Sequence, residues 1–479
     1  MENRTLMTDH YEYTMAYAYF KSGIANTTTY FDVFFRHNPL EGGYTISCGL
    51  DNIINFIKNI KFTKEEINYF RRKYNYDEDF LEYLANLKFT GDIFAIPDGT
   101  VVFPNEPVIT VRANAVEAQI IETALLAYFN HGHLIATSAK RITEAAQGRP
   151  VSEFGARRSQ GEASIEASKY AIIGGCDSTS NEEAGKKYDL KVSGTMAHSY
   201  IQMFPTEEEA FISYAKTNPE NCIFLVDTYD TINSGIPAAI KVAKEFLIPN
   251  GIKFKGIRID SGDLAYLSKV ARKMLDEAGF TDTQICLSNG LNEEKITSLI
   301  NQGAKFDSIG AGDNVVAPEE QGNAVYKLVA IEKDGLVIPK IKVSNDTGKT
   351  INPGYKKVYR FYDKETGFAL GDVIALHDEK ISTEKFTLIC PTDINKRKTI
   401  TNYTVRELQV PIFLNGNLVY NDMSVLEKQQ YCKNDFNTFY PEIKRIDNPH
   451  EYYVDLTEKL LNLKNDLIQQ HKGKVKIKK

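Results

Sequence analysis

The chain has 479 residues, of which 42% are hydrophobic and 25% charged, the balance of a folded globular protein rather than a disordered one. Its net charge of −6 argues against a protein that binds nucleic acid through a basic surface. Six widely spaced cysteines, with no CxxC pair, indicate a reducing compartment and no zinc site. This length predicts two or three domains.

Nothing in the sequence predicts a membrane segment or an export signal. The longest apolar runs, such as Cys222–Val226, have the length of a strand, far below the ~20 residues of a membrane span. Residues 1–5 lack the charged and then apolar layout of a signal peptide, and we find no lipidation motif. We therefore expect a cytoplasmic protein of enzyme size with no membrane partner.

In the first 128 residues, some segments repeat their apolar residues with the period of a helix and others with the period of a strand. The pattern predicts helices over residues 50–60 and 64–74 and strands over 28–35 and 108–111. We expect residues 1–128 to form the first part of an α+β domain.

Residues 129–320 consist of repeated βα units and are the predicted catalytic domain. Short apolar runs end in small or polar residues at 151–154, 171–175, 190–194, 222–226, 254–259, 284–287 and 306–309. Predicted helices lie between them, for example over 206–215, 263–275 and 292–300. Seven such units imply a parallel sheet in an α/β fold. An irregular parallel (β/α) barrel is the first choice and an open doubly wound sheet the second.

The C-terminal third changes character twice. Residues 321–415 show the alternating pattern of β-strands, for example over 325–331 and 356–362. We expect this β-rich segment to complete a discontinuous α+β domain built from both flanks. Residues 416–479 are predicted to be a mostly helical extension, and their lysine-rich end, 472–479, a solvated tail.

The predicted strands end in side chains that suit a phosphorylated sugar and a divalent metal. The C-terminal strand ends of a parallel α/β domain collect the active site. Arginines there offer bidentate contacts to phosphate or carboxylate, glycine-rich turns offer backbone N–H groups, and paired aspartates can hold magnesium or sugar hydroxyls. The strand-end segments are 153–158, 177–181, 193–199, 227–230, 258–263, 288–290 and 310–313.

Each strand-end feature also has a purely structural interpretation. The arginines could form salt bridges, the aspartates could cap the next helix, the histidine could be a structural residue and the glycines could make turns. The residues concerned are Arg157, Arg158, Asp260, Asp263, His198, Gly310 and Gly312. Their coincidence at successive strand ends favours the functional interpretation.

Several motifs together resemble one known family, the nicotinate phosphoribosyltransferases. They are Glu-Phe-Gly-x-Arg-Arg at 153–158, Gly-Thr-x-Ala-His-Ser at 194–199 and Arg-Ile-Asp-Ser-Gly-Asp-Leu at 258–264, with Thr8–Ala16 before them. The resemblance runs to about Leu328 and weakens in the last third. It implies transfer of the phosphoribosyl group from 5-phosphoribosyl 1-diphosphate to nicotinate, coupled to ATP hydrolysis. Nicotinate mononucleotide and diphosphate are the products, in NAD salvage.

The resemblance also implies roles for the catalytic residues. His198 is the residue that ATP phosphorylates. Asp227 and Asp260 lie near the ribose and a magnesium ion, where they stabilise an electron-poor ribosyl centre. Phe154 and Tyr11 resemble the aromatic pair that sandwiches the pyridine ring, and the tyrosine of related enzymes comes from the partner subunit, which implies a homodimer.

Further positions are carried over for substrate binding. Arg157 and Arg258 would face the nicotinate carboxylate or the phosphates, and Thr195 would hydrogen-bond the base. The predicted backbone cradle for the product phosphate is Asn289, Gly290, Gly310 and Gly312. The chain departs from the family at Asp313, where the family usually has a threonine; a carboxylate there is unfavourable beside phosphate unless it turns away or holds a cation.

The base pocket decides between nicotinate and nicotinamide. Nicotinamide enzymes place an aspartate at the position that Ser180 fills here, and a serine can donate to a carboxylate without repelling it. We therefore favour nicotinate. The alternatives are a nicotinamide phosphoribosyltransferase and a non-catalytic nucleotide-binding homologue. A sugar-phosphate isomerase or aldolase is disfavoured because no convincing strand-end lysine is present.

Overall fold

The computed structural model describes residues 3–343, 350–391, 393 and 395–472, and the chain divides into two compact units. The parallel-sheet unit contains Ile135–Glu320 and Ser424–Gln430. The flank unit contains Met1–Leu134, Gln321–Met423 and Tyr431–Lys479. Helices α6 (Glu122–Ala145) and α15 (Val425–Phe436) contribute residues to both units.

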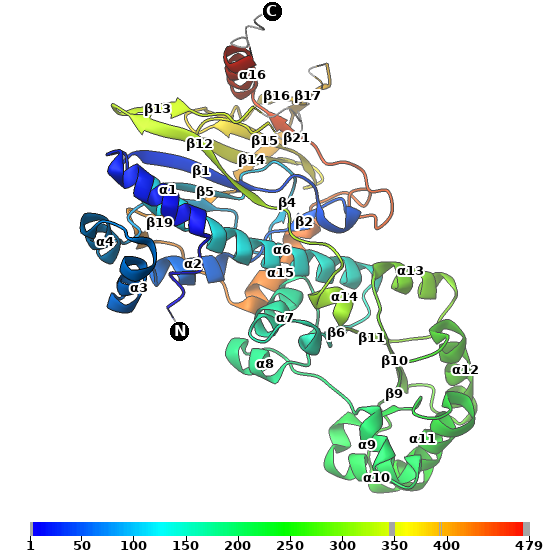
Figure 1. Cartoon of the computed structure of the whole chain (residues 1–479). Helices are drawn as coiled ribbons and strands as arrows, with labels where there is room; N and C mark the ends of the chain where they lie inside the picture. Colours follow the sequence, from blue (N-terminus) through cyan, green and yellow to red (C-terminus); the bar gives the residue numbers. More distant parts are fainter. Residues whose placement is uncertain (1–2, 344–349, 392, 394, 473–479) are drawn as a thin grey trace, which may run out of the picture. The chain divides into compact units, whose positions relative to one another are not determined.

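Antiparallel pairing joins distant segments of the flank unit. Its largest sheet has the strand order β13-β12-β1-β5-β3-β19-β20, so both flanks of the chain share one sheet (Figure 1). A second sheet, β17-β16-β21-β15-β14-β18, comes from residues after 355, and β2 pairs with β4. The strands are β1 (Thr28–Phe34), β2 (Thr45–Ile46), β3 (Asp92–Ala95), β4 (Val101–Val102), β5 (Ile109–Asn114), β12 (Val325–Lys333), β13 (Leu336–Pro339), β14 (Lys356–Asp363), β15 (Ala369–Leu376), β16 (Lys385–Ile389), β17 (Arg397–Thr401), β18 (Tyr403–Glu407), β19 (Val410–Leu414), β20 (Asn417–Leu418) and β21 (Val454–Leu456).

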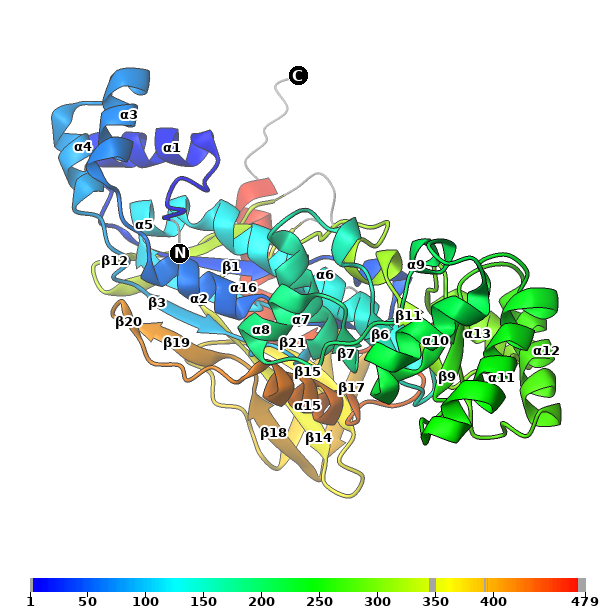
Figure 2. The ribbon, with the colours of Figure 1, turned by 90° about the horizontal axis from the view of Figure 1, so that it is seen from below.

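The helices of the flank unit follow strong local signals. Thr63 and Glu66 form a reciprocal capping box at the start of α3, where the sequence predicted the helix to begin. Helices α1, α3 and α4 lie side by side in Figures 1 and 2, and the Tyr13 and Phe70 rings meet at 4.7 Å between centroids. The helices are α1 (His10–Lys21), α2 (Leu50–Lys58), α3 (Lys64–Tyr74), α4 (Glu78–Ala85), α5 (Ala115–Ile120) and α16 (Glu458–Lys472). Among the described helices, none combines the length and the hydrophobicity that crossing a bilayer requires.

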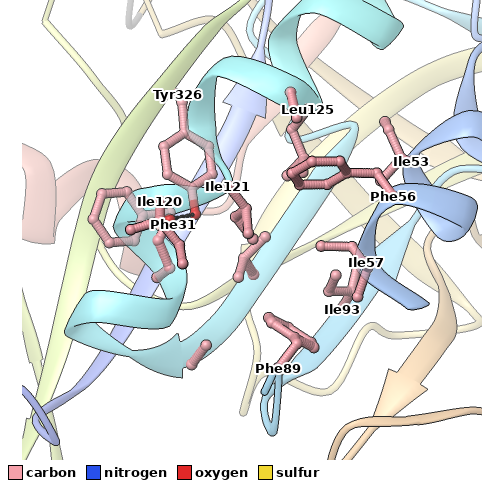
Figure 3. Close-up of a cluster of buried hydrophobic side chains, with 14 of the residues drawn as sticks. Phe31, Ile53, Phe56, Ile57, Phe89, Ile93, Ile120, Ile121, Leu125 and Tyr326 are labelled. Atoms are coloured by element: carbon pink, nitrogen blue, oxygen red, sulfur yellow. Dashed lines mark hydrogen bonds between the residues drawn. The ribbon is translucent and has the colours of Figure 1, made fainter. Parts of the chain in front are cut away.

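The core of the flank unit ties its two flanks together (Figure 3). Phe31 on β1 stacks on Tyr326 on β12 with ring centroids 4.5 Å apart, and the Tyr326 hydroxyl donates to the Ala118 carbonyl at 2.8 Å. Burial of such aromatic pairs stabilises a fold beyond the area that they remove from water. Residues nearly 300 positions apart are therefore held in one core.

The parallel-sheet unit contains the strands that carry the predicted site. Its sheet is parallel throughout, in the order β7-β6-β11-β10-β9-β8, and helix α12 packs beside β9 and β10 (Figures 1 and 2). The strands are β6 (Val151–Glu153), β7 (Ser178–Thr179), β8 (Ile223–Leu225), β9 (Gly256–Ile259), β10 (Gln284–Ser288) and β11 (Ser308–Ala311). The helices are α7 (Ala163–Ile173), α8 (Glu182–Tyr188), α9 (His198–Gln202), α10 (Glu207–Thr217), α11 (Ile236–Val242), α12 (Leu264–Glu277), α13 (Glu293–Asn301) and α14 (Asp313–Val316).

Three expectations about this region change. The predicted strand at 171–175 is instead the end of α7 and its turn; its apolar residues are buried, and a short apolar run does not distinguish a strand from a buried helix. The run at 190–194 contributes an isolated bridge at Val192 rather than a strand. The described sheet therefore has six strands, with β7 and β8 at its edges, and its pairing does not establish the predicted barrel.

The C-terminal extension is only partly helical. Helices α15 and α16 fit the prediction, but β20 and β21 also lie after residue 415, and β21 pairs with both β15 and β16. Residues 473–479 of the predicted tail lie outside the described residues.

Candidate active site

Strand register places one polar row across the C-terminal end of the parallel sheet. Ser178 pairs with Ser152, Ser152 with Gly310, and Gly310 with Ser288. Leu287 pairs with Ile259, so the next residues, Ser288 and Asp260, are neighbours as well. Side chains at matching positions of parallel strands point to the same face, so the serines of this row share one face of the sheet, with Gly310, which has no side chain, between Ser152 and Ser288.

Arg258 on β9 organises the middle of this surface. Its Nε donates to the Ser288 hydroxyl at 2.9 Å and its Nη1 to the Thr195 hydroxyl at 3.1 Å. Its Nη2 lies 3.3 Å from Oδ1 of Asp260, which also accepts a hydrogen bond from Ser288. The guanidinium and the carboxylate are thus held at fixed positions on neighbouring strand ends.

Asp227 follows β8 and connects this network to His198. Its side chain is 1% exposed; Oδ2 accepts from the Asp260 backbone N–H at 2.9 Å and from the Ser261 hydroxyl at 2.6 Å. Oδ1 lies 3.2 Å from Nε2 of His198, the first residue of α9, whose side chain is 38% exposed. A buried carboxylate at one ring nitrogen fixes the orientation of an imidazole and leaves the other nitrogen for chemistry.

Phe154 lies against Gly310, with no room for a side chain between them. A Cβ built on Gly310 would lie 2.5 Å from Cε2 of the Phe154 ring. The backbone of Phe154 is held by its N–H, which donates to the Ala311 carbonyl at 2.7 Å. The Arg258 guanidinium carbon is 5.7 Å from the ring centroid, so a cation flanks this aromatic surface.

Glu153 holds the base of the same loop. It is fully buried, and its carboxylate accepts hydrogen bonds from the Gly155 N–H, from the Ser168 hydroxyl at 2.9 Å and from the Thr179 hydroxyl at 2.6 Å. Its backbone carbonyl accepts from the Ser180 N–H at 2.9 Å. This acceptor set shows that Glu153 positions residues 154–155 and 179–180.

The two predicted phosphate loops differ in backbone conformation. Asn289 and Gly290 both have positive φ, 107° and 55°, so the turn after β10 is held in a region that non-glycine residues rarely enter. Gly312 precedes α14, whose first residue is Asp313. Lys295 donates to the Gly290 carbonyl at 2.7 Å, and sequence reasoning had not selected this lysine.

The remaining predicted residues are distributed less tightly. Asp263 is the N-cap of α12, accepting from the Tyr266 N–H at 2.9 Å, so the structural interpretation holds for that aspartate. Arg157 is exposed in the turn Ala156–Arg158. Tyr11 lies on α1 of the flank unit, 46% exposed, and its pKa is raised by burial and by Glu122.

Sequence reasoning missed the hydroxyl groups that complete the site. Ser288 bridges Arg258 and Asp260, and Ser261 holds Asp227. The only feature of the sequence that pointed to these two serines was their location in the strand-end segments. A serine is too common at strand ends for that position to select it.

Two carboxylates could contribute to a magnesium site. Both oxygens of Asp227 are engaged by protein groups, whereas Oδ2 of Asp260 accepts no hydrogen bond from the described residues. Across residues 3–343, 350–391, 393 and 395–472, no three His, Cys, Asp or Glu side chains gather to hold a metal. The pair therefore fits a magnesium ion held largely by substrate phosphates, the usual arrangement for this ion, rather than a cage of protein ligands.

Comparison with known proteins decides the family. The descriptions of the nicotinate phosphoribosyltransferase (NAPRTase) N-terminal domain, family and C-terminal domain match residues 6–130, 150–360 and 355–464. The nicotinate phosphoribosyltransferase of Bacillus subtilis (strain 168) is 43% identical over 478 residues, covering 99% of this chain and 97% of the relative. The chain belongs to the nicotinate phosphoribosyltransferase family.

More distant members agree with this assignment. The nicotinate phosphoribosyltransferase of Caenorhabditis elegans is 33% identical over 531 residues, covering 97% of this chain and 93% of the relative. The crystal structure of human nicotinic acid phosphoribosyltransferase superposes with a TM-score of 0.84 at 26% identity, covering 96% of this chain and 99% of that one. The predicted family and the mixed α/β fold with a parallel sheet are confirmed, and this is a family of enzymes.

Proposed function

We propose that the chain transfers the 5-phosphoribosyl group from 5-phosphoribosyl 1-diphosphate to nicotinate, with ATP hydrolysis coupled to the transfer, in NAD salvage. The observation that carries the proposal is the hydrogen-bonded series Arg258–Asp260–Asp227–His198 beside the Phe154 ring. ATP coupling is a trait of this family. The series joins the base surface, the ribosyl centre and the coupling histidine within one sheet edge.

The base would bind on Phe154. The absence of a side chain at Gly310 makes room for the ring, and the adjacent Arg258 guanidinium offers a cation to the nicotinate carboxylate or to a phosphate. Thr195, already bonded to Arg258, would hydrogen-bond the base. We assign Ser180 to the carboxylate side of the pocket, Arg157 to the carboxylate or the phosphates, and Tyr11 to the second face of the pyridine ring. The role of Tyr11 requires a homodimer, in which each subunit supplies Tyr11 to the site of its partner.

The acidic end of the row would stabilise the reacting sugar. As diphosphate leaves, the C1–O bond breaks and positive charge grows on the ribosyl carbon before the pyridine nitrogen bonds to it. Asp227 and Asp260 place negative charge on that side of the site, held by N–H and O–H donors. Magnesium, held by these two aspartates and by diphosphate oxygens, would neutralise the leaving group.

His198 would take the γ-phosphoryl group of ATP: a ring nitrogen bonds to the γ-phosphorus while the bond from that phosphorus to the β,γ-bridging oxygen breaks and ADP leaves. Its Nε2 faces Asp227, so Nδ1 is the nitrogen left to receive phosphorus. A phosphohistidine at the start of α9 would add charge and hydrogen-bond acceptors over the sugar diphosphate. The loops at Asn289–Gly290 and Gly310–Asp313 would present backbone N–H groups to the 5-phosphate, with the Asp313 carboxylate turned away from it.

We also retain the predicted architecture as a proposal: segments 1–128, 129–320, 321–415 and 416–479, with the parallel sheet as an incomplete, irregular barrel. The wide spacing of six cysteines supports a cytoplasmic location.

The test is release of diphosphate from 5-phosphoribosyl 1-diphosphate and magnesium, with nicotinate or nicotinamide, with and without ATP. Activity with nicotinate that rises with ATP supports base, reaction and coupling together. Activity with nicotinamide alone keeps the reaction and overturns the assignment of Ser180. Absence of activity with either base favours the non-catalytic homologue. Asp313→Thr is then the first substitution to test for restored activity.

A further inference from the structure

Two buried polar side chains on α6 reach two different loops of the parallel-sheet unit. The Ser138 hydroxyl donates to the Asn314 carbonyl at 2.6 Å, and the Arg141 Nε donates to Oε1 of Glu293 at 2.7 Å. Residues three apart lie on the same helix face, so one face of α6 makes both contacts. The Ser138 residue and the Arg141 side chain are 1% and 5% exposed.

The two loops are the ones assigned to the phosphate. Glu293 is the first residue of α13 and follows the turn Asn289–Gly290 by three residues. Asn314 is the second residue of α14 and follows Gly312 and Asp313. Both contacts therefore act on helix starts directly behind a predicted phosphate loop.

The Arg141–Glu293 pair is poorly explained by stability alone. Glu293 is nearly buried, and Nη1 of Arg141 is buried with no hydrogen-bond partner among the described residues. A buried ion pair often stabilises a fold no more than apolar residues of the same volume do, and an unsatisfied buried donor is unfavourable. A positional role explains why such an arrangement is present here.

The turn at Asn289 needs such support. Its φ of 107° is unfavourable for a side-chain-bearing residue, and such conformations persist only where neighbouring contacts impose them. Lys295 holds the Gly290 carbonyl and the Asn292 side chain caps α13, both from within the loop and helix themselves. Arg141 adds a contact to α13 from a different element, α6.

We propose that Ser138 and Arg141 are positioning residues that hold the two loops at the separation needed to bind the 5-phosphate of the sugar substrate. This inference rests on the proposed function. Both side chains are buried behind the loops, so they act through Asn314 and Glu293 rather than by touching the substrate. Precise placement matters because a displacement of about 1 Å in a binding group can reduce rate about 100-fold.

The test compares Ser138→Ala and Arg141→Lys with wild type, using ribose 5-phosphate and ribose as non-reacting probes in calorimetry. Ser138→Ala is a small deletion, and Arg141→Lys keeps the charge but loses the planar fork. We expect ribose 5-phosphate affinity to fall at least about tenfold in both variants, with the KM for 5-phosphoribosyl 1-diphosphate rising and the KM for nicotinate within about twofold of wild type. The matched control is Lys140→Met, which removes a buried cation of the same helix whose ion-pair partner, Glu144, is also on α6.

The outcomes separate this inference from the proposed reaction. Selective loss of ribose 5-phosphate affinity supports the positioning role even if wild type turns over neither base. The inference is overturned by any of three results. These are an unchanged affinity for ribose 5-phosphate in both variants, an equal loss of that affinity in the Lys140→Met control, and equal rises in the KM for 5-phosphoribosyl 1-diphosphate and the KM for nicotinate. Wild type that binds ribose 5-phosphate no better than ribose overturns it together with the phosphate loops.

Discussion

Replacing Gly310 with alanine tests how closely the sheet approaches the proposed base surface. The added Cβ would lie 2.5 Å from Cε2 and 2.6 Å from Cδ2 of Phe154, and 3.3 Å from the Ser288 Cβ. Carbon atoms pack at about 3.5–4.0 Å, so the ring must withdraw by about 1 Å. Overpacking of this kind costs about 1–3 kcal/mol of folding free energy.

The same movement should weaken nicotinate binding. An aromatic stacking contact contributes about 0.5–1.5 kcal/mol, so a tilted ring should raise the nicotinate dissociation constant about 2- to 13-fold. Urea unfolding measures the first effect, and calorimetric titration with nicotinate measures the second. Gly194→Ala is the control for the unfolding measurement, because a Cβ there meets nothing within 4 Å.

A double-mutant cycle with Phe154→Ala shows whether the ring is the cause. Once the ring is removed, Gly310→Ala should change the free energy of unfolding by no more than about 0.5 kcal/mol. A loss that is equally large with alanine at position 154 would refute the reasoning and point to Ser288 or the backbone instead.

Three further predictions address the coupling histidine, the base pocket and a buried ion pair. His198→Ala should abolish labelling of the protein by γ-³²P-ATP and leave slow, ATP-independent synthesis; full retention of ATP stimulation would contradict the assignment. Ser180→Asp should shift the ratio of kcat/KM values at least about tenfold towards nicotinamide, because a carboxylate repels nicotinate and accepts from an amide; an unchanged ratio would disprove the pocket assignment. Burial raises the pKa of Glu166, but Lys169 and two other donors outweigh burial and hold it at about 2, below the usual 4.5. The ionised Glu166 therefore contributes about 3 kcal/mol to the free energy of unfolding above pH 4.5, and this contribution is lost as pH falls towards 2. Glu166→Gln should accordingly be less stable than wild type in urea unfolding at neutral pH, and the difference should shrink between pH 4.5 and 2. Glu182→Gln, a surface change on α8, is the control, and a deficit independent of pH would argue against the ion pair.

Features governed by nearby residues could be predicted from the sequence. The Thr63 capping box and the Thr206 cap begin helices where the pattern placed them, because a cap and its helix are adjacent in the chain. Strand ends carrying Asp227, Arg258 and Asp260 were also predicted, and they do meet at one edge of a parallel sheet.

Features that depend on burial in the folded protein could not be predicted from the sequence in this way. Residues 171–175 are apolar because helix α7 is buried, and the sequence alone could not distinguish that cause from a strand. Strand β21 pairs within a sheet whose other strands lie up to 98 residues earlier, so its three residues carried no local signal.

The sequence by itself determined the family, the parallel order of βα units and the polar strand ends, since these reside in short motifs. Only the tertiary structure decided that Ser288 joins Arg258 to Asp260, that Phe154 lies against Gly310 and that Arg141 bonds to Glu293 at the start of α13. Each of those contacts depends on the register or packing of elements more than 25 residues apart. Such contacts are set by how the whole core packs, and no single segment encodes them.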